Sequence, residues 1–334
     1  MTISSSYSVK QCLPGFVGFI LVLSSLAVGL SSAADNSQEA EPLRDTYSAT
    51  QVSDSVYVIH GPSGLPNPGN QGFMNNPAFV ITAEGVVVID SGSSVQIGRM
   101  VLEKIETVTN LPVVAIFSTH IHGDHWLANQ AIHEAYPAVK MYAHPDLIEL
   151  AQGGEAENWI DLMMQLTNDS TKGTVAVIPD MPVNDGDQIH IGGSIFSIHH
   201  KGQAHTTSDI AVLVMPENVI FTGDLVFNKR LGRMDDGNFA GLSETLDHLI
   251  SLGPSVVVPG HGITAGVEII RSAKRLNDMI YQTVQEKFED GLSDFEMKPI
   301  VLERTSEFSD WDGFEESMGR IVSLSYLEVE EENF

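Results

Sequence analysis

Short apolar segments alternate with segments of helical periodicity through most of the chain. Continuous apolar runs predict strands at residues 56–60, 78–82, 85–90, 112–118, 139–143, 210–215, 219–221 and 255–258, and residues 189–200 predict a hairpin. Helical spacing predicts one helix over residues 95–109 and helical structure within 145–168. The tail from Ala265 is predicted to be helical, because Ile269, Ala273, Leu276 and Ile280 follow at intervals of three or four. This alternation is typical of an α/β protein.

The first 34 residues have the order of a secretory signal peptide. Lys10 precedes an apolar run from Phe16 to Leu30, and small residues occupy positions 31–34. We expect cleavage after Ala33 or Ala34 and export to the periplasm or the medium. A retained membrane anchor is the alternative, because an apolar run of about 17 residues is the lower limit for a bilayer span.

The same pattern divides the chain into four parts. They are a signal peptide at residues 1–34, a polar stretch at 35–50, an α/β domain at 51–264, and a helical extension at 265–334 that we expect to pack on that domain. The single cysteine, Cys12, lies in the signal segment. The exported chain therefore has neither a disulfide nor a thiolate metal ligand.

Composition narrows the choice of partners. The chain has 17 basic and 44 acidic residues, which gives a formal net charge of −27 at pH 7. Nucleic acids and anionic membrane surfaces are disfavoured as partners, because both would repel such a chain. We expect a small-molecule substrate and no membrane association after cleavage, and the sequence leaves the oligomeric state open.

Four metal-competent side chains follow the strand predicted at residues 112–118. The segment reads Thr119-His120-Ile121-His122-Gly123-Asp124-His125. Side chains two apart in extended backbone point the same way, so His120 and His122 can bind one metal ion. Asp124 and His125 follow on the next turn and can face a second ion. A cluster of this kind has few structural uses, and it predicts a metal site.

Three later segments place a potential ligand after a predicted strand and beside glycine, which lets the backbone approach a metal closely. The ligands are His205 in Gly202-Gln203-Ala204-His205, Asp224 after Thr222-Gly223, and His261 between Gly260 and Gly262. Each alone would be an ordinary loop or turn residue, and the earlier cluster is what gives them significance. The other histidines lack this context and are interpreted as surface or packing residues: His60, His133, His144, His190, His199, His200 and His248.

At these residues the chain resembles the metallo-beta-lactamase superfamily, whose five motifs occur in order between roughly Val52 and Gly262. The resemblance implies a four-layer αββα sandwich with two metal ions at one edge between the sheets. It implies the following roles: first metal, His120, His122 and His205; second metal, Asp124, His125 and His261; bridging ligand, Asp224; residue that orients the ligands through hydrogen bonds, Asp90.

Motif detail is most similar to glyoxalase II-like and quinoprotein-associated zinc hydrolases. These proteins also carry histidine after the metal-binding aspartate and aspartate at the bridging position. Class B beta-lactamases often have cysteine where this chain has Asp224.

The ligand chemistry indicates a metal-dependent hydrolase. We expect two zinc ions per chain, although nitrogen and oxygen ligands also suit iron or manganese. A metal-bound hydroxide would attack a carbonyl carbon, and Asp124 is the predicted catalytic residue, which orients the hydroxide and carries a proton to the leaving group. The expected reaction is hydrolysis of an ester, thioester or lactone. Opening of a beta-lactam is one alternative, and a mononuclear-iron oxygenase of the persulfide dioxygenase type is another.

Five further residues are predicted to contact substrate. Phe73 and Met74 end a loop rich in glycine and proline that starts at Gly61, and such loops shape specificity in this family. The others are Phe227, Lys229 and Arg230. Lys229, Arg230 and Arg233 form a basic cluster near Asp224 and are candidates for binding a substrate carboxylate, with salt bridges to Asp235 and Asp236 as the equally open alternative.

Overall fold

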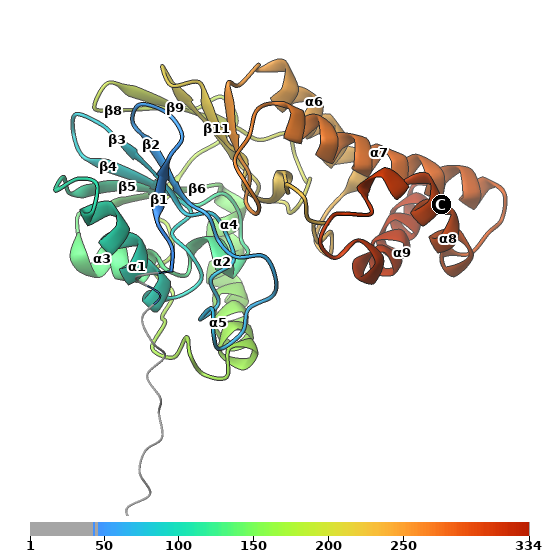
Figure 1. The fold of residues 1–334 in the computed structure, drawn as a ribbon, viewed down its shortest axis with the longest axis horizontal. Coiled ribbons are helices and arrows are strands. Elements are labelled where there is room, and N and C mark those ends of the chain that lie inside the picture. Colours follow the sequence, from blue (N-terminus) through green and yellow to red (C-terminus); the bar gives the residue numbers. More distant parts are fainter. Residues whose placement is uncertain (1–42, 44–45, 334) are drawn as a thin grey trace, which may run out of the picture. The chain divides into compact units, whose positions relative to one another are not determined.

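The computed structural model describes Leu43 and residues 46–333, so the predicted signal segment lies outside the described residues. The described chain contains two β-sheets (Figure 1). The first has the order β1-β2-β3-β4-β5-β6-β7, with these bounds: β1 Ala49–Gln51, β2 Val56–Ile59, β3 Ala78–Ile81, β4 Val86–Ile89, β5 Val113–Phe117, β6 Lys140–Ala143, β7 Met181–Pro182. Strands β1 to β4 pair antiparallel, and β4 to β7 pair parallel.

The second sheet has the order β12-β11-β10-β9-β8. Its strands have these bounds: β8 Gln188–Ile191, β9 Ser194–His199, β10 Ala211–Met215, β11 Val219–Phe221, β12 Val256–Val258. Strands β8 to β11 pair antiparallel, whereas β11 and β12 pair parallel. In β9, buried residues alternate with half-buried ones, as the two-residue period of a strand requires.

The space between the two sheets is filled by apolar side chains from both. Val87 and Phe117 come from the first sheet, and Phe196 and Val212 come from the second. The rings of Phe117 and Phe196 stack with centroids 5.3 Å apart. Burial of this apolar area is the main force that holds the sheets face to face.

Helices cover the outer faces of both sheets, with these bounds: α1 Val95–Glu106, α2 Gly123–Trp126, α3 Asn129–Ala135, α4 Pro145–Leu150, α5 Ala156–Leu166, α6 Phe239–Ser251, α7 Glu268–Glu289, α8 Asp294–Arg304, α9 Phe314–Asn333. Apolar residues of α1 and α3 pack on the first sheet. A π-helical turn, η2 (Ala151–Glu155), joins α4 to α5. The predicted αββα layering is confirmed.

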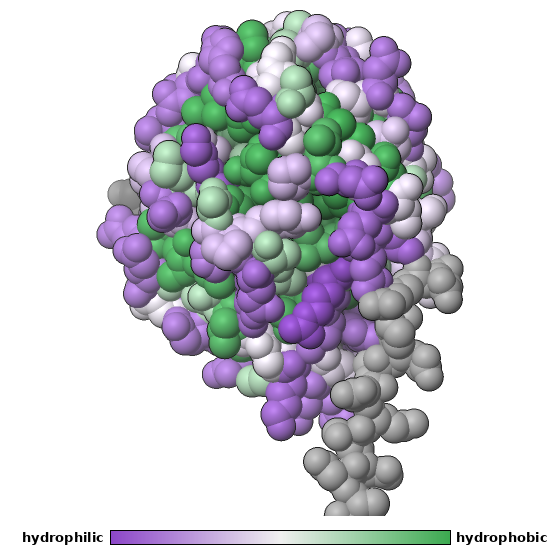
Figure 2. Space-filling model, turned by 90° about the vertical axis from the view of Figure 1, so that its left-hand side faces the viewer, coloured by the Kyte–Doolittle hydropathy of each residue, from purple (hydrophilic) through white to green (hydrophobic). Residues whose placement is uncertain are grey.

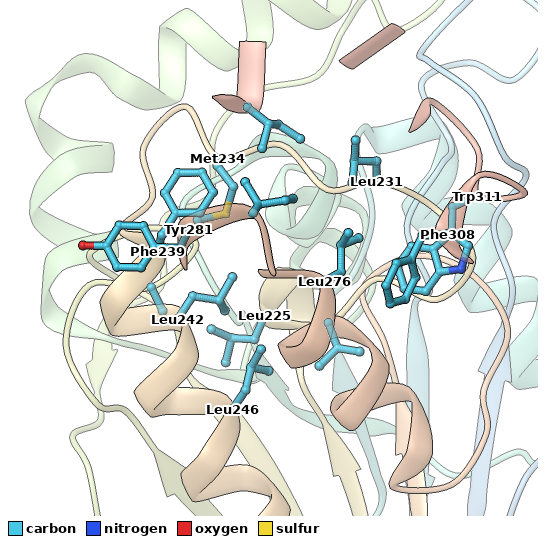
Figure 3. Close-up of a cluster of buried hydrophobic side chains, with 14 of the residues drawn as sticks. Leu225, Leu231, Met234, Phe239, Leu242, Leu246, Leu276, Tyr281, Phe308 and Trp311 are labelled. Carbon is cyan, nitrogen blue, oxygen red and sulfur yellow. The ribbon is translucent and has the colours of Figure 1, made fainter. Parts of the chain in front are cut away.

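Helices α6 to α9 share one apolar cluster with the second sheet. Leu225, Phe239, Leu276 and Trp311 belong to it, and Figure 3 draws them among their neighbours. The tail from residue 265 is helical, as its spacing predicts, and its side chains help to bury the outer face of the second sheet. None of the helices in the described part of the chain is long and apolar enough to cross a membrane.

The last helix also reaches the start of α6. The Glu328 carboxylate on α9 accepts hydrogen bonds from the backbone N–H groups of Phe239 (2.7 Å) and Ala240 (3.0 Å). The first N–H groups of a helix have no acceptor within the helix itself, and negative charge near them is stabilising. Glu328 supplies both the acceptor and the charge. The residue before α6, Asn238, donates its own backbone N–H to the carbonyl of Ala204 at 2.8 Å. Strand β1 and helix α6 are elements that the sequence reading did not specify.

The face shown in Figure 2 carries many hydrophilic side chains, with smaller apolar areas between them. This agrees with a chain that has 44 acidic residues.

Candidate metal centre

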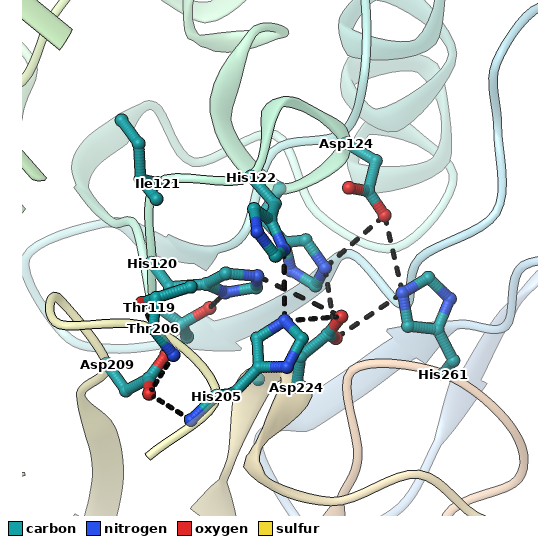
Figure 4. Close-up of polar contacts among 12 residues, drawn as sticks. Thr119, His120, Ile121, His122, Asp124, His205, Thr206, Asp209, Asp224 and His261 are labelled. Carbon is teal, nitrogen blue, oxygen red and sulfur yellow. Dashed lines mark hydrogen bonds and ion pairs between the residues drawn. The ribbon is translucent and has the colours of Figure 1, made fainter. Parts of the chain in front are cut away.

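The seven side chains predicted to bind metal lie together at one edge of the two sheets (Figure 4). They follow the carboxyl ends of strands: His120 to His125 come after β5, Asp224 after β11, and His261 after β12. His205 lies on the loop between β9 and β10. Because β4 and β5 are parallel, Asp90 at the end of β4 lies beside the same cluster.

The first group contains His120, His122, His205 and Asp224, whose ligand atoms lie within 4.8 Å of one another. Nε2 of His205 is 3.0 Å from Nδ1 of His122. The Oδ2 atom of Asp224 is 3.5 Å from Nε2 of His205 and 3.9 Å from Nε2 of His120. A divalent ion fits among three imidazole nitrogens and a carboxylate oxygen.

The second group contains Asp124, His125 and His261. Oδ2 of Asp124 is 3.4 Å from Nε2 of His125 and 3.3 Å from Nε2 of His261. The other oxygen of Asp224, Oδ1, faces this group, at 3.1 Å from His125 and 3.3 Å from His261. The carboxylate of Asp224 therefore lies between the groups with one oxygen toward each, which is the geometry of a bridging ligand.

Several of these atoms are buried without a hydrogen bond among the described residues. They are Nε2 of His120, Oδ2 of Asp124, Nε2 of His125 and Oδ1 of Asp224. An unsatisfied buried polar group costs roughly 1–3 kcal/mol, so four of them in contact need a partner. Cations at the two groups satisfy all four, and the donor set suits zinc as well as iron or manganese.

Neighbouring residues fix the orientation of the second group and of His120. Asp90 accepts from Nδ1 of His125 at 2.8 Å and from the backbone N–H and hydroxyl of Thr119, both at 2.8 Å. The Thr119 hydroxyl also lies 3.0 Å from Nδ1 of His120. Nδ1 of His261 lies 2.8 Å from the carbonyl oxygen of Met74, in the loop that starts at Gly61. In each of the three histidines Nε2 remains free to face a metal ion.

Two further carboxylates support the first group. Oδ2 of Asp236 lies 3.0 Å from Nε2 of His122, which leaves Nδ1 toward the metal position. Asp209 accepts from the backbone N–H groups of His205 and Thr206, both at 2.7 Å, and from the Thr206 hydroxyl at 2.8 Å. It thereby holds the backbone of the loop that carries His205.

The two groups differ in their affinity for protons. Burial lowers the pKa of His120 well below its ordinary value, and burial with the nearby His122 lowers that of His205 to about 3. Burial also acts to lower the pKa of His125 and His261, but the carboxylates around them outweigh it and raise both. His125 and His261 therefore bind protons more readily than His120 and His205 do.

Close packing at Asp224 explains one of the glycines. A Cβ atom at Gly260 would lie 2.0 Å from Oδ1 of Asp224 and 2.7 Å from the backbone of Gly223. A side chain at position 260 would have to displace the bridging carboxylate. The sequence Pro259-Gly260-His261 is thus constrained by the metal ligand on the neighbouring strand.

A cavity of about 510 Å³ opens onto both groups. Of the five residues predicted to contact substrate, Met74, Phe227 and Arg230 line it. The expectation for Phe73 is wrong: its side chain is 0% exposed and packs edge-on against Tyr47 in the core under the first sheet.

The expectation for Lys229 is also wrong. Its side chain is 64% exposed, its ammonium group pairs with Asp310 at 2.7 Å, and the residue does not line the cavity. Arg233 pairs with Asp235, as the salt-bridge alternative predicts. Asp236 contacts His122 instead of a basic residue.

The sequence reading missed Asp209, Asp236 and Trp159 as parts of the site. The ring of Trp159 on α5 lies 5.0 Å from that of His122. Asp209 follows His205 by four residues, and this short spacing could have indicated from the sequence that its carboxylate supports the loop of His205. Trp159 and Asp236 are 37 and 114 positions from His122, so no local pattern connects them with it.

Comparison with known proteins agrees with this arrangement. A model of the metallo-beta-lactamase superfamily matches residues 71–261, a span that includes every candidate ligand. A metallo-beta-lactamase type 2 from Bacteroides fragilis is 23% identical, over 72% of this chain and 88% of that protein. A probable hydroxyacylglutathione hydrolase from Schizosaccharomyces pombe is 25% identical, over 60% of this chain and 69% of that protein.

Among solved structures, a metallo-beta-lactamase from Pontibacter korlensis matches with a TM-score of 0.56 and 22% identity. The match covers 70% of this chain and 99% of that one. At this level of identity the likeness establishes the fold and leaves the substrate open.

Proposed function

Because the chain belongs to the metallo-beta-lactamase superfamily of metal-dependent hydrolases, we propose that it is a two-zinc enzyme that hydrolyses an ester, thioester or lactone. One observation carries the proposal: the two oxygens of Asp224 face two groups of ligands, and buried atoms in both groups have no hydrogen bond among the described residues. Two zinc ions bound there would polarise a carbonyl oxygen and lower the pKa of a water molecule to about 7.

We assign the proton-handling role to Asp124. Its carboxylate belongs to the second group, and its Oδ2 atom is buried without a hydrogen bond. Burial raises the pKa of this carboxyl, but His125 and His261 outweigh burial and hold it well below its ordinary value. Asp124 is therefore ionised and able to accept a proton from water and return it to the leaving group.

The residue three positions after Asp224 favours this substrate class over beta-lactams. Beta-lactamases of the class that the chain partly resembles often hold the drug carboxylate with lysine there, whereas this chain has Phe227, whose ring stacks on that of His261 with centroids 5.3 Å apart. An aromatic ring does not replace a fixed charge. Beta-lactam hydrolysis is the second candidate, because the B. fragilis relative is named a metallo-beta-lactamase.

We also propose that the enzyme is exported, on the strength of the basic, apolar and small-residue order at residues 1–34. A mature N-terminus at Ala34 or Asp35, found by mass spectrometry of secreted or periplasmic material, would support this. Recovery of the full-length chain in the membrane fraction would contradict it.

Metal content and catalytic efficiency test the proposed function. Elemental analysis of the purified protein should give about two transition-metal ions per chain. On zinc-loaded protein, a simple thioester or lactone should be hydrolysed measurably and the cephalosporin nitrocefin weakly or not at all, because the missing contact to the drug carboxylate costs roughly tenfold to a hundredfold in efficiency. A metal content well below one after incubation with zinc contradicts the two-zinc site, and a clear preference for nitrocefin promotes the second candidate.

A further inference from the structure

The cavity above the metal centre holds one basic side chain without a partner. Arg230 lines the cavity, and its Nη1 atom is buried without a hydrogen bond among the described residues. The neighbouring Arg233 also lines the cavity, but its Nε donates to Asp235 at 2.7 Å. A buried guanidinium donor with no acceptor is costly, and a carboxylate is the acceptor that matches it best.

The backbone on both sides of Arg230 is held firmly. Leu231 donates its N–H to the carbonyl of Asp312 at 2.9 Å, and Asp312 donates to the carbonyl of Lys229 at 3.0 Å. These bonds tie the segment to the stretch that precedes α9. The guanidinium therefore projects from a fixed main chain, which reduces the entropy lost when it binds a ligand.

One wall of the cavity is apolar and comes from one face of α5. Trp159, Leu162, Met163 and Leu166 lie at positions i, i+3, i+4 and i+7 of this helix, and all four line the cavity. Leu166 is 41% exposed, and Leu65, which lines the cavity from the loop that starts at Gly61, is 66% exposed. Exposed apolar side chains gathered at the mouth of a cavity indicate a surface that binds an apolar group.

Aromatic rings that line the cavity also contact the candidate ligands. Trp159 lies against His122 of the first group, with ring centroids 5.0 Å apart. Phe227 stacks on His261 of the second group and lies edge-on to His205 of the first, with centroids 5.3 and 5.9 Å apart. The same cavity therefore joins both ligand groups to the apolar face of α5 and to Arg230.

We propose that the substrate is amphiphilic, with an apolar acyl group bound along α5 and a single carboxylate on the leaving group bound by Arg230. This inference rests on the proposed function. Hydrolysis breaks the acyl C–S or C–O bond, and water supplies hydroxyl to the carbonyl carbon and a proton to the departing sulfur or oxygen. A second negative charge would be repelled, because Glu155, Asp235 and Asp236 also line the cavity.

The test of the cation uses a matched pair of thioesters, S-octanoyl-3-mercaptopropanoate and its carboxamide. Zinc-loaded wild-type protein should prefer the carboxylate by about tenfold or more in kcat/KM. Arg230→Gln should abolish this preference by slowing only the carboxylate, and Arg230→Lys should restore part of it. Lys229→Gln, beside it but outside the cavity, is the control and should keep the wild-type ratio.

The test of the apolar wall compares octanoyl with acetyl thioesters. Each added CH₂ contributes up to about 0.8 kcal/mol of binding when fully buried, or about fourfold, so a strong preference for the octanoyl group is expected. Leu166→Gln should reduce the octanoyl-to-acetyl ratio at least several-fold. Leu150→Gln, an exposed leucine on α4 that does not line this cavity, should leave the ratio unchanged.

A binding measurement separates this inference from the proposed function. The ketone 5-oxododecanoate replaces the thioester sulfur with CH₂ and cannot be hydrolysed, so calorimetry with it and its primary amide needs no turnover. Tighter binding of the carboxylate in wild type but not in Arg230→Gln supports the inference, even if neither thioester is hydrolysed and the hydrolase proposal falls. Equal binding of carboxylate and amide by wild type, or equal weakening of both by Arg230→Gln, overturns it.

Discussion

The two candidate metal groups share Asp224 but are built differently. In the first, burial lowers the pKa of His120 and His205, and the supporting carboxylates, Asp209 and Asp236, lie outside the ligand set. The second contains its own carboxylate, Asp124, and its histidines are raised in pKa by surrounding negative charge. The difference indicates a first group that is ready for a metal ion and a second group that must first release protons.

The shared ligand gives the largest expected effect. Asp224→Ala removes the carboxylate that faces both groups and should lower zinc content from about two ions per chain to one or fewer. Turnover should fall by about 10³-fold or more, since several kcal/mol of metal-dependent stabilisation is lost. Elemental analysis and thioester kinetics are the measurements. Retention of two tightly bound ions would show that the groups are independent, contrary to the bridging geometry.

A change confined to the second group should be almost as severe for catalysis and less severe for metal content. Asp124→Asn removes charge but little volume, so turnover should fall by about 10²- to 10⁴-fold while at least one zinc ion remains bound. His133→Ala, away from the centre, is the control. If the control lost as much activity while both proteins stayed folded, the assignment of Asp124 would be wrong.

A change behind the first group should be smaller. Asp236→Asn weakens the acceptor that orients His122, and losses of this kind typically reduce metal affinity by about 10- to 100-fold. Competition with a fluorescent zinc chelator measures the affinity of each ion. We expect only one of the two dissociation constants to change, and a change in both would contradict the separate support of the two groups.

The smallest effect is in the protons released when zinc binds. Surrounding carboxylates raise the pKa of His125 and His261, and both side chains must be neutral to bind zinc. Filling the second group should therefore release more protons than filling the first, and its affinity should rise with pH until the raised pKa values are passed. Calorimetry in buffers of different ionisation enthalpy counts these protons. If both zinc ions released the same number of protons, the two groups would not differ in proton affinity.

Much of the centre could be predicted from the sequence, because its ligands occupy short motifs at strand ends. The two-residue period of extended backbone relates His120 to His122, and the buried run before Asp90 marks a strand that ends at the same edge. The layers of the fold follow from the same alternation of strands and helices. Helix α6 was not predicted, although the sequence contains its signals: the N-cap residue Asn238 and apolar residues at helical spacing.

What the sequence could not supply is the set of contacts made by surfaces far apart in the chain. Phe73 and Met74 are adjacent, yet one is buried in the core and the other lines the cavity. The choice between them depends on how the loop is anchored, which no local pattern gives. Lys229 and Arg230 are also adjacent, and the sequence does not say which of them lines the cavity. Lys229 pairs with Asp310, 81 positions away, and Arg230 lines the cavity.

The contact between α9 and α6 has a practical consequence for handling this protein. Glu328 lies six residues from the end of the chain, and its carboxylate satisfies the first donors of α6, whose neighbour Asn238 is bonded to Ala204, next to the ligand His205. Proteolytic trimming of the last turns would expose those donors at one end and loosen a metal-bearing loop at the other. A variant that lacks Glu328 is therefore unsuitable for measuring metal binding, because a weaker affinity could then come from the loosened loop instead of from the ligands.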